Sequence, residues 1–254
     1  MATGLALLPF ASANAYETIP GAAVGAAVNI PIPGGTFTTP FIITVSGNYY
    51  LTGNRIFTGV AGPAILVDVP GGDAEVYIDL NGRTLSDPVP TNFAFGIQTF
   101  SQIDVTVQNG DIDGFYIGVF FAHNTGVNAK NTAQNLKFNG NTIGVMSLSG
   151  TSNWIKDNII DGGDVGVYLA DDAGSRVQNN IIQDQAITEQ IGLGIALVST
   201  ASGGNLFDNN EVLKGGNAIG QFLGSLDKYR FESFVGYTTL SPLVGGTNEL
   251  DGSL

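Results

Sequence analysis

The chain has 254 residues, of which 43% are hydrophobic, and this is enough to build one substantial core. Its formal net charge of −13 argues against nucleic acid as a partner, because phosphate contacts need a basic face. The lack of cysteine excludes disulfides and thiolate zinc sites. We expect a single domain whose surface is largely neutral and polar, since only 12% of the residues are charged.

The first 15 residues, MATGLALLPFASANA, have the features of a segment that directs export. An apolar run ends in Ala13-Asn14-Ala15, a small-residue cleavage pattern, and this predicts a signal peptide over residues 1–15. No Lys or Arg precedes the run, so two alternatives stay open: the true start lies upstream, or the segment is an ordinary N-terminal strand. No run reaches the length of a membrane span. The predicted location is secreted, periplasmic or at the cell surface.

The next segment, residues 16–45, is rich in Ala, Gly and Pro, and we assign it to a lead-in that caps the first repeat. Residues 46–224 contain the repeats. Residues 225–254 lose the repeat pattern and are assigned to a C-terminal cap or tail.

The repeat is clearest between Asn153 and Asp184, where one phrase occurs twice. Residues 155–160, IKDNII, return as residues 177–182, VQNNII, 22 residues later. A period of this length, with short alternating strands, is typical of a solenoid. Alignment on the apolar residue that opens the phrase gives the register Leu51, Ile78, Val107, Leu136, Ile155, Val177 and Phe207.

This pattern predicts an all-β, single-stranded parallel β-helix of roughly seven to nine coils. Stacking the coils at the strand spacing of about 4.8 Å buries the apolar residues in continuous columns. We expect the opening residue to point inward together with Ile112, Ile160, Ile182 and Val212. An asparagine, or a glycine in one copy, follows each opener by three residues, and stacked asparagines can bond from coil to coil. An antiparallel sandwich would show hairpin signals instead.

A family resemblance rests on three stretches: residues 46–51, SGNYYL; residues 76–85, VYIDLNGRTL; and residues 105–110, VTVQNG. They look like bacterial right-handed parallel β-helix repeat proteins of the pectate-lyase-like superfamily, over roughly residues 44–222. The resemblance implies a right-handed coil with three short parallel sheets. It implies little about activity, because that group holds lyases, hydrolases, epimerases and members without known chemistry.

Basic residues gather on one predicted face. Because side chains alternate along a strand, the residues on either side of each opener face solvent and form two columns. In this register the first column reads Tyr77, Thr106, Asn135, Trp154, Arg176 and Leu206, and the second reads Asp79, Gln108, Lys137, Lys156, Gln178 and Asp208. Lys137 and Lys156 would then lie about 5 Å apart.

This face is the first candidate site. Trp154 would stack on a sugar ring, with Gln178, Gln108 and Asn135 as further substrate-binding residues. In a lyase, Lys156 would remove the proton α to a uronate carboxylate, with its pKa lowered by the cation of Lys137, and Arg176 would hold the carboxylate. The alternative is a solvated face of ordinary lysines.

Aspartates provide a second candidate site. Asp161 and Asp164 follow one asparagine corner and Asp184 follows the next, so their carboxylates could bind Ca²⁺. The resemblance adds that pectate-lyase-like enzymes often use calcium to bridge an acidic substrate. The alternative is that aspartate is simply a common turn residue.

Two neighbouring aspartates and the single histidine form a third candidate. His123 and Asp171 occupy equivalent places two coils apart, with Ser149 between them, about 10 Å apart at the backbone. The Asp171-Asp172 pair is similar to that of polygalacturonases, but the other motifs of that family are absent.

The sequence favours carbohydrate recognition outside the cytoplasm, with lyase or epimerase chemistry on an acidic glycan as its catalytic version. The alternative is a non-catalytic structural or adhesive surface protein, or a building block of a homo-oligomer. The predicted partner is a polysaccharide or cell-surface glycan. No phosphate-binding loop or dinucleotide fingerprint occurs, so no organic cofactor is expected, and Ca²⁺ is the candidate ion.

Overall fold

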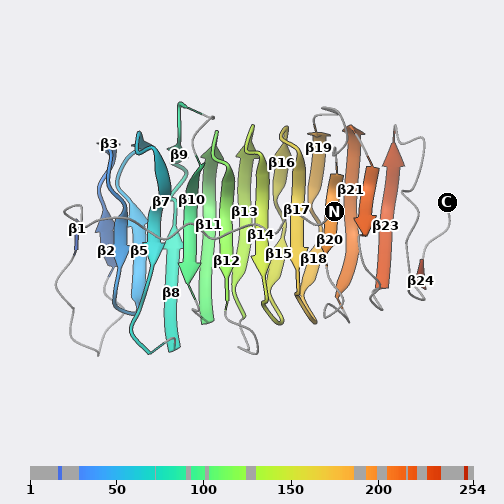
Figure 1. Cartoon of the computed structure of the whole chain (residues 1–254), viewed down its shortest axis with the longest axis horizontal. Coiled ribbons are helices and arrows are strands. Elements are labelled where there is room, and N and C mark those ends of the chain that lie inside the picture. The colour runs from blue at the N-terminus through green and yellow to red at the C-terminus, as the bar shows by residue number, and fades with distance from the viewer. Residues whose placement is uncertain are drawn as a thin grey trace, which may run out of the picture.

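The fold was analysed in a computed structural model, which describes residues 17–18, 29–71, 73–89, 93–100, 103–123, 130–185, 193–198, 205–215, 217–221, 228–235 and 249–250. In these residues all regular structure is β-strand. The strands stack along the long axis of the molecule, from β1 at the left of Figure 1 to β24 at the right. None of the described elements is a helix long and apolar enough to cross a membrane. The predicted signal peptide, residues 1–15, lies outside the described residues.

Two parallel sheets make up the solenoid. Sheet A has nine strands in the order β1 (Glu17–Thr18), β4 (Phe41–Ile43), β7 (Ala61–Val67), β10 (Phe93–Phe100), β12 (Ile117–Ala122), β14 (Ile143–Leu148), β17 (Val165–Ala170), β20 (Leu193–Val198) and β22 (Asn217–Gln221). Every neighbouring pair is parallel, and successive sheet A strands are separated in the chain by strands of the other sheet. The chain is a right-handed parallel β-helix, and the nine strands of sheet A agree with the predicted number of coils.

Sheet B bends into two limbs. The first limb contains β2 (Asn29–Ile32), β5 (Gly47–Leu51), β8 (Asp73–Asp79), β15 (Trp154–Lys156) and β18 (Arg176–Gln178). The second contains β3 (Gly35–Phe37), β6 (Arg55–Phe57), β9 (Thr84–Ser86), β16 (Ile159–Asp161) and β19 (Ile181–Gln185). Four longer strands run through the bend and belong to both limbs: β11 (Ile103–Asp113), β13 (Thr132–Asn139), β21 (Leu206–Gly215) and β23 (Lys228–Val235).

The segments assigned to the two caps also contain strands. In residues 16–45, β2, β3 and β4 pair with β5, β6 and β7 of the next coil. In residues 225–254, β23 (Lys228–Val235) pairs with β21 and with β24 (Glu249–Leu250). The division into lead-in, solenoid and tail stays a prediction.

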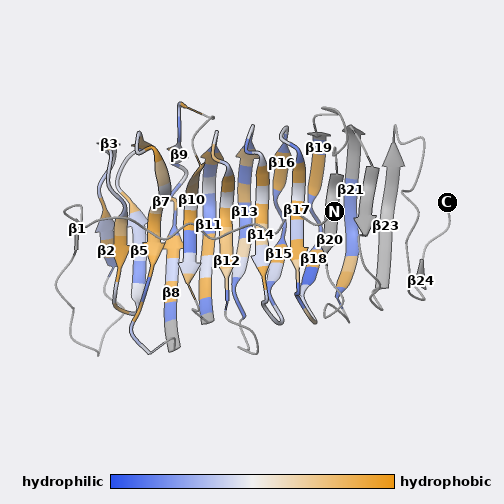
Figure 2. Cartoon of the chain, viewed as in Figure 1, coloured by the Kyte–Doolittle hydropathy of each residue, from blue (hydrophilic) through white to orange (hydrophobic). Residues whose placement is uncertain are grey.

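The core is a set of apolar columns between the sheets. Ile112, Ile160 and Ile182 are buried as predicted, while the side chain of Val212 lies outside the description. Buried and more exposed residues alternate along sheet B strands such as β13, whereas sheet A strands such as β12 and β17 are apolar along most of their length (Figure 2). In a single coil these apolar side chains would be exposed to water. Stacking the coils buries them, and each Å² of apolar surface buried stabilises the fold by about 25 cal/mol.

The predicted register is wrong in two coils. Ile78 pairs with Tyr49 instead of Leu51, and Ile155 pairs with Ala133 instead of Leu136. In both coils the alignment places a leucine at the opening position, whereas the residue that occupies this position is Tyr49 in one coil and Ala133 in the other. Leu136 is still buried, but it lies past the bend of β13, opposite Gly110.

Asparagines form the predicted ladder at the bend. Asn158, Asn180 and Asn210 are buried. Asn158 Nδ2 donates to Asn180 Oδ1 at 3.0 Å, and Asn180 Nδ2 donates to Asn210 Oδ1 at 2.9 Å. The Nδ2 atoms of all three asparagines also donate to backbone carbonyls of the preceding coil. The left-handed conformation expected of these asparagines occurs one residue earlier in all three coils, at Asp157, Asn179 and Asn209.

A second ladder was not predicted. It lies where the chain enters the first limb and contains Asn131, Asn153, Ser175 and Asn205, all buried. Each side-chain oxygen accepts from the backbone N–H of the preceding coil, over 2.8–3.0 Å. Buried backbone groups need such partners wherever the strand ladder is interrupted.

Candidate functional site

The outer face of the first limb is polar and aromatic. Its side chains form two columns that follow the solenoid axis, because each coil places its residues over those of the previous one. Column 1 contains Asn29, Asn48, Tyr77, Thr106, Thr132, Trp154, Arg176 and Leu206, and column 2 contains Pro31, Tyr50, Asp79, Gln108, Gln134, Lys156, Gln178 and Asp208. We call these two columns together the polar face.

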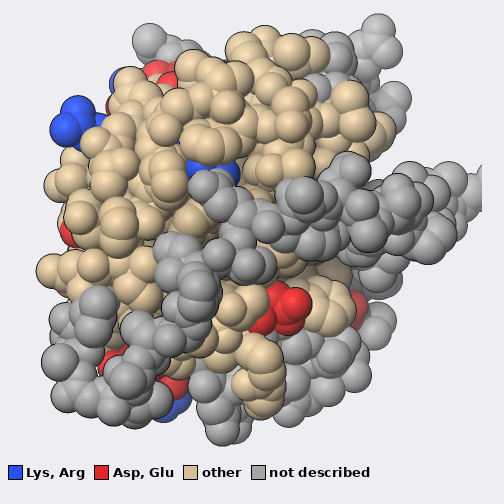
Figure 3. All heavy atoms as spheres, turned by 90° about the vertical axis from the view of Figure 1, so that its left-hand side faces the viewer, with Lys and Arg blue, Asp and Glu red and all other residues tan. Residues whose placement is uncertain are grey.

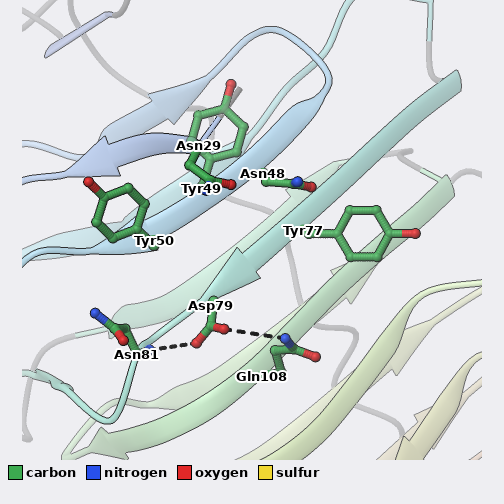
Figure 4. A pocket seen from close by; sticks show the side chains of 8 residues that line it. All are labelled: Asn29, Asn48, Tyr49, Tyr50, Tyr77, Asp79, Asn81 and Gln108. Atoms are coloured by element: carbon green, nitrogen blue, oxygen red, sulfur yellow. Dashed lines mark hydrogen bonds between the residues drawn. The ribbon is translucent and has the colours of Figure 1, made fainter. Parts of the chain in front are cut away.

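A groove opens at the N-terminal end of the polar face, over β2, β5, β8 and β11. It has a volume of about 610 Å³, and its outward lining residues are Asn29, Asn48, Tyr50, Tyr77, Asp79 and Gln108. The rings of Tyr50 and Tyr77 lie on either side of the Asp79 carboxylate (Figure 4). A volume of this size accommodates a small organic ligand or several sugar rings.

The Asp79 carboxylate is fixed by three donors. One oxygen accepts from the backbone N–H of Asn81 at 2.7 Å, and the other accepts from Gln108 Nε2 at 3.4 Å and from Asn109 Nδ2 at 3.1 Å. Gln108 in turn accepts from Gln134 Nε2 at 2.8 Å. The floor of the groove is therefore a connected polar row that continues along column 2.

The groove is locally acidic. The Tyr77 hydroxyl donates to Glu75 at 3.2 Å. The pKa of Tyr77 is raised, first by desolvation, then by that hydrogen bond and by the negative charges of Glu75 and Asp104. No Lys or Arg is among the described residues that line the groove. Seen from the N-terminal end, the described surface has few charged side chains of either sign (Figure 3).

A second cluster lies further along the same columns, on β15 and β18. Trp154 is 37% exposed, and its Nε1 donates to Gln178 Oε1 at 3.0 Å. The Lys156 ammonium lies 4.0 Å from the centroid of the Trp154 ring, a cation–π contact. Arg176 is exposed beside Trp154 on the next coil. We call these four residues the basic patch.

The structure brings five of the predicted site residues onto the polar face: Gln108, Trp154, Lys156, Arg176 and Gln178. Asn135 and Lys137 were predicted there but lie elsewhere. Asn135 is in the left-handed corner of β13, with φ 52°. Lys137 follows the bend and pairs with Asp111 and Ile159 on the second limb. Lys137 and Lys156 are therefore not neighbours, because the true opener of that coil is Ala133.

Of the aspartates expected to bind Ca²⁺, the described Asp161 and Asp164 do not belong to a cluster that could hold a metal ion. Asp161 accepts from Gln183 Nε2 at 3.1 Å, and the side chain of Asp184 lies outside the description. Among the described residues, no three His, Asp or Glu side chains lie close enough to hold a metal ion. A calcium site stays a prediction, without support from this geometry.

His123 and Asp171 do occupy equivalent positions, on either side of Ser149. His123 is buried, its Nε2 lies 3.1 Å from Asn131 Nδ2, and burial lowers its pKa from 6.5 to about 4. Asp171 is exposed, whereas Asp172 is buried and accepts from Ser147 and Asn153. The two aspartates therefore face different surroundings and do not form a carboxylate pair.

The groove was missed by sequence reasoning, although Tyr77 and Asp79 were placed in the columns. The missing signal is the Asn48-Tyr49-Tyr50 stretch. Alignment on Leu51 shifted this coil by two residues, and it hid the position of Tyr50 beside Asp79 in column 2.

The family described as periplasmic copper-binding protein (NosD) matches residues 75–222. A comparison with curated proteins finds no match.

Two structures of PfbA, a surface adhesin of Streptococcus pneumoniae, are similar. One is 11% identical, with a TM-score of 0.30, and 89% of this chain and 92% of that chain are covered. The other is 10% identical, with a TM-score of 0.33, and the covered shares are 87% and 81%.

A mutant tailspike protein of E. coli bacteriophage HK620, in complex with a pentasaccharide, is also similar. It is 10% identical and has a TM-score of 0.28, and 92% of this chain and 58% of that chain are covered.

Proposed function

We propose that this chain, which belongs to the family described as periplasmic copper-binding protein (NosD), binds an acidic glycan through its polar face. It is an extracytoplasmic β-helix protein, periplasmic or at the cell surface. The observation that carries the proposal is the alignment of aromatic rings, amides and cations in two columns on one face.

Copper, which the family description names, does not fit the side chains of this chain. There is no cysteine, and His123 is the only histidine. His123 is buried with its Nε2 beside Asn131, and Met146 is buried in an apolar cluster on the outer face of sheet A. Copper sites in proteins use thiolate, thioether and imidazole ligands grouped together, and the described residues contain no such group.

The basic patch suits a carboxylated or sulfated sugar. An aromatic ring offers an apolar platform with specific geometry, and an arginine holds a carboxylate in a bidentate pair. Trp154 and Arg176 are adjacent in column 1, so a ring stacked on Trp154 would place its acidic group near the guanidinium. Lys156, in contact with the Trp154 ring, would add a second cation.

We propose recognition without bond cleavage. A lyase or epimerase would need Lys156 uncharged as a base. Lys137, the neighbour expected to disfavour its charge, is on the other limb. The Lys156 side chain instead lies against the Trp154 ring, where it is placed to contact an anion bound beside that ring. Glycan binding without cleavage is the function of an adhesive surface protein. Assembly of the chain into a homo-oligomer stays a prediction.

The test is a calorimetric titration with a panel of uronate oligosaccharides. We expect Lys156→Ala and Arg176→Ala each to weaken binding about tenfold, the loss of one charge-assisted hydrogen bond of about 1.4 kcal/mol. Lys137→Ala is the matched control, a lysine on the same coil stack but outside the polar face, and should bind as the wild type does. Trp154 is the only tryptophan, so quenching of its fluorescence reports directly on the patch.

Equal losses in Lys137→Ala and Lys156→Ala would contradict the proposed site. Absorbance from an unsaturated product, lost in Lys156→Ala, would show lyase chemistry and overturn recognition without cleavage. If no uronate oligosaccharide binds or quenches Trp154, the glycan proposal fails and the structural alternative takes its place.

A further inference from the structure

The groove between Tyr50 and Tyr77 has unused hydrogen-bonding groups. Within the described part of the chain, no hydrogen bond is made by the amides of Asn29 and Asn48 or by the Tyr50 hydroxyl, and all three residues line the groove. The Asp79 carboxylate beside them is held in place by its three donors. Aromatic faces next to fixed polar groups favour ligands that have both apolar C–H faces and hydroxyls.

The charge of the groove selects against an acidic ligand. Asp79 is on its floor, and Glu75 and Asp104 act on Tyr77 at its edge. A carboxylate or sulfate would meet like charges here, which is unfavourable at short range. The basic patch has the opposite character, so the two sites on the polar face differ in the sign of their charge.

The groove and the basic patch are joined by the columns. Thr106 and Thr132 separate Tyr77 from Trp154 in column 1, so three coil steps place these residues about 14 Å apart at the backbone. In column 2, Gln134 bonds to Gln108 and is followed by Lys156. The connecting surface is hydroxyl and amide throughout, without a charge that would interrupt an extended ligand.

We propose that the groove is a second binding site, for uncharged sugar residues of the same glycan chain that the basic patch binds. The glycan lies along the solenoid axis, with its uncharged segment at Tyr50 and Tyr77 and its acidic residue at Trp154 and Arg176. This inference rests on the proposed function, and it adds the class of ligand: a linear glycan in which uncharged sugars precede an acidic one.

The test uses calorimetry with xylo-oligosaccharides that carry one glucuronate at one end, in a series from the disaccharide upward. We expect affinity to rise at least tenfold once the chain is long enough to reach the groove. Tyr77→Ala should remove that rise and leave the disaccharide unaffected, whereas Lys156→Ala should weaken every member. Gln108→Ala is a second groove variant, and Phe93→Ala, an aromatic residue 64% exposed on sheet A, is the matched control.

The outcomes separate this inference from the proposed function. If long and short members bind equally and both depend on Lys156, the groove site is overturned and the basic patch stands. If the gain with length persists in both Tyr77→Ala and Gln108→Ala, the groove is likewise overturned. If no member of the series binds, the inference fails, and the uronate panel decides the proposed function separately.

Discussion

Two rows of amide side chains that stack from coil to coil differ in solvent access: one lies inside the bend of sheet B and the other on the polar face. At the bend, Asn158 and Asn180 are fully buried, and their amides bond to the next asparagine and to a backbone carbonyl. On the polar face, Gln108 and Gln134 share one bond of 2.8 Å and remain partly exposed. The same repeat thus forms one row whose hydrogen bonds are all made within the protein, and one row whose amides can also form hydrogen bonds with a ligand.

This difference follows from solvent access. A buried amide without a partner costs about 1–3 kcal/mol, so an interior row persists only if every member is bonded. An exposed amide can exchange its partner for water at little cost, and a ligand hydroxyl can take the place of that water. The buried rows should therefore control stability, and the exposed rows should control binding.

The strongest way to test this comparison is to interrupt the buried ladder. Asn180→Ala leaves the Asn158 backbone N–H and the Ile155 carbonyl without partners. We expect the free energy of unfolding to fall by about 3–5 kcal/mol, from two or more unsatisfied groups. Denaturant unfolding measures this, with Gln178→Ala, two residues away on the polar face, as the control. A loss below about 1 kcal/mol for Asn180→Ala would mean that water replaces the ladder.

The ladder ends at Leu136, whose backbone N–H donates to Asn158 Oδ1. Leu136→Ala should cost about 2–5 kcal/mol, as a buried leucine truncation does. Leu136→Asn should cost less than Leu136→Ala, because its amide can extend the ladder while it fills part of the volume. Thermal unfolding of the two variants gives their order. The reverse order would show that Leu136 acts only through apolar packing.

Acid should weaken the second buried row through His123. Because burial lowers the pKa of His123 from 6.5 to about 4, the unfolded chain binds the proton more readily within that interval. The stabilising effect of neutral His123 is complete above pH 6.5 and is lost as the pH falls toward 4, about 3 kcal/mol in all.

A pH series of unfolding experiments on wild type and His123→Gln isolates this contribution. Burial raises the pKa of Asp87 and of Asp113, so these groups act in the opposite sense in both proteins. The difference between the two curves should change mainly between pH 6.5 and 4. A constant difference would contradict this prediction, because it would show that His123 binds a proton equally well in the folded and in the unfolded chain, as a solvated imidazole does.

The smallest expected change in stability is that of Gln134→Ala, which breaks the exposed row between the groove and the basic patch. We expect the free energy of unfolding to change by less than about 0.5 kcal/mol, as for most surface substitutions. Binding of the longest glycan in the series should weaken, while binding of the disaccharide stays the same. A loss of stability comparable to that of Asn180→Ala would remove the distinction between the two regions.

The sequence was sufficient for the fold because stacking imposes a strict spacing on Asn, Gly and apolar residues. It was not sufficient for the register of every coil. Ala133 is a small opener that is buried at 0% exposure, and no property of alanine alone distinguishes it from a surface residue. Leu136, three residues on, is the stronger apolar signal, but it fills the place that asparagine takes in later coils.

Two displacements account for the part of the candidate site that was not found. The one at Leu51 hid the position of Tyr50 beside Asp79, and the other is at Leu136. The second moved Asn135 and Lys137 onto the polar face and displaced Thr132 and Gln134 from it. The basic patch was located correctly because Ile155 and Val177 share an unambiguous phrase 22 residues apart. The groove depends on side chains from four coils around an aspartate, and the shape of such a surface is not encoded in any single motif.

The 22-residue coil that begins with Trp154 also works as a unit of length. A tandem duplication of such a coil would preserve every interior column and both asparagine ladders, because each coil contacts only its neighbours. It would move the groove and the basic patch apart, or enlarge the patch, by about 4.8 Å. Ligand length could then evolve by copying whole coils, in fixed increments, with no change to the residues that make the contacts.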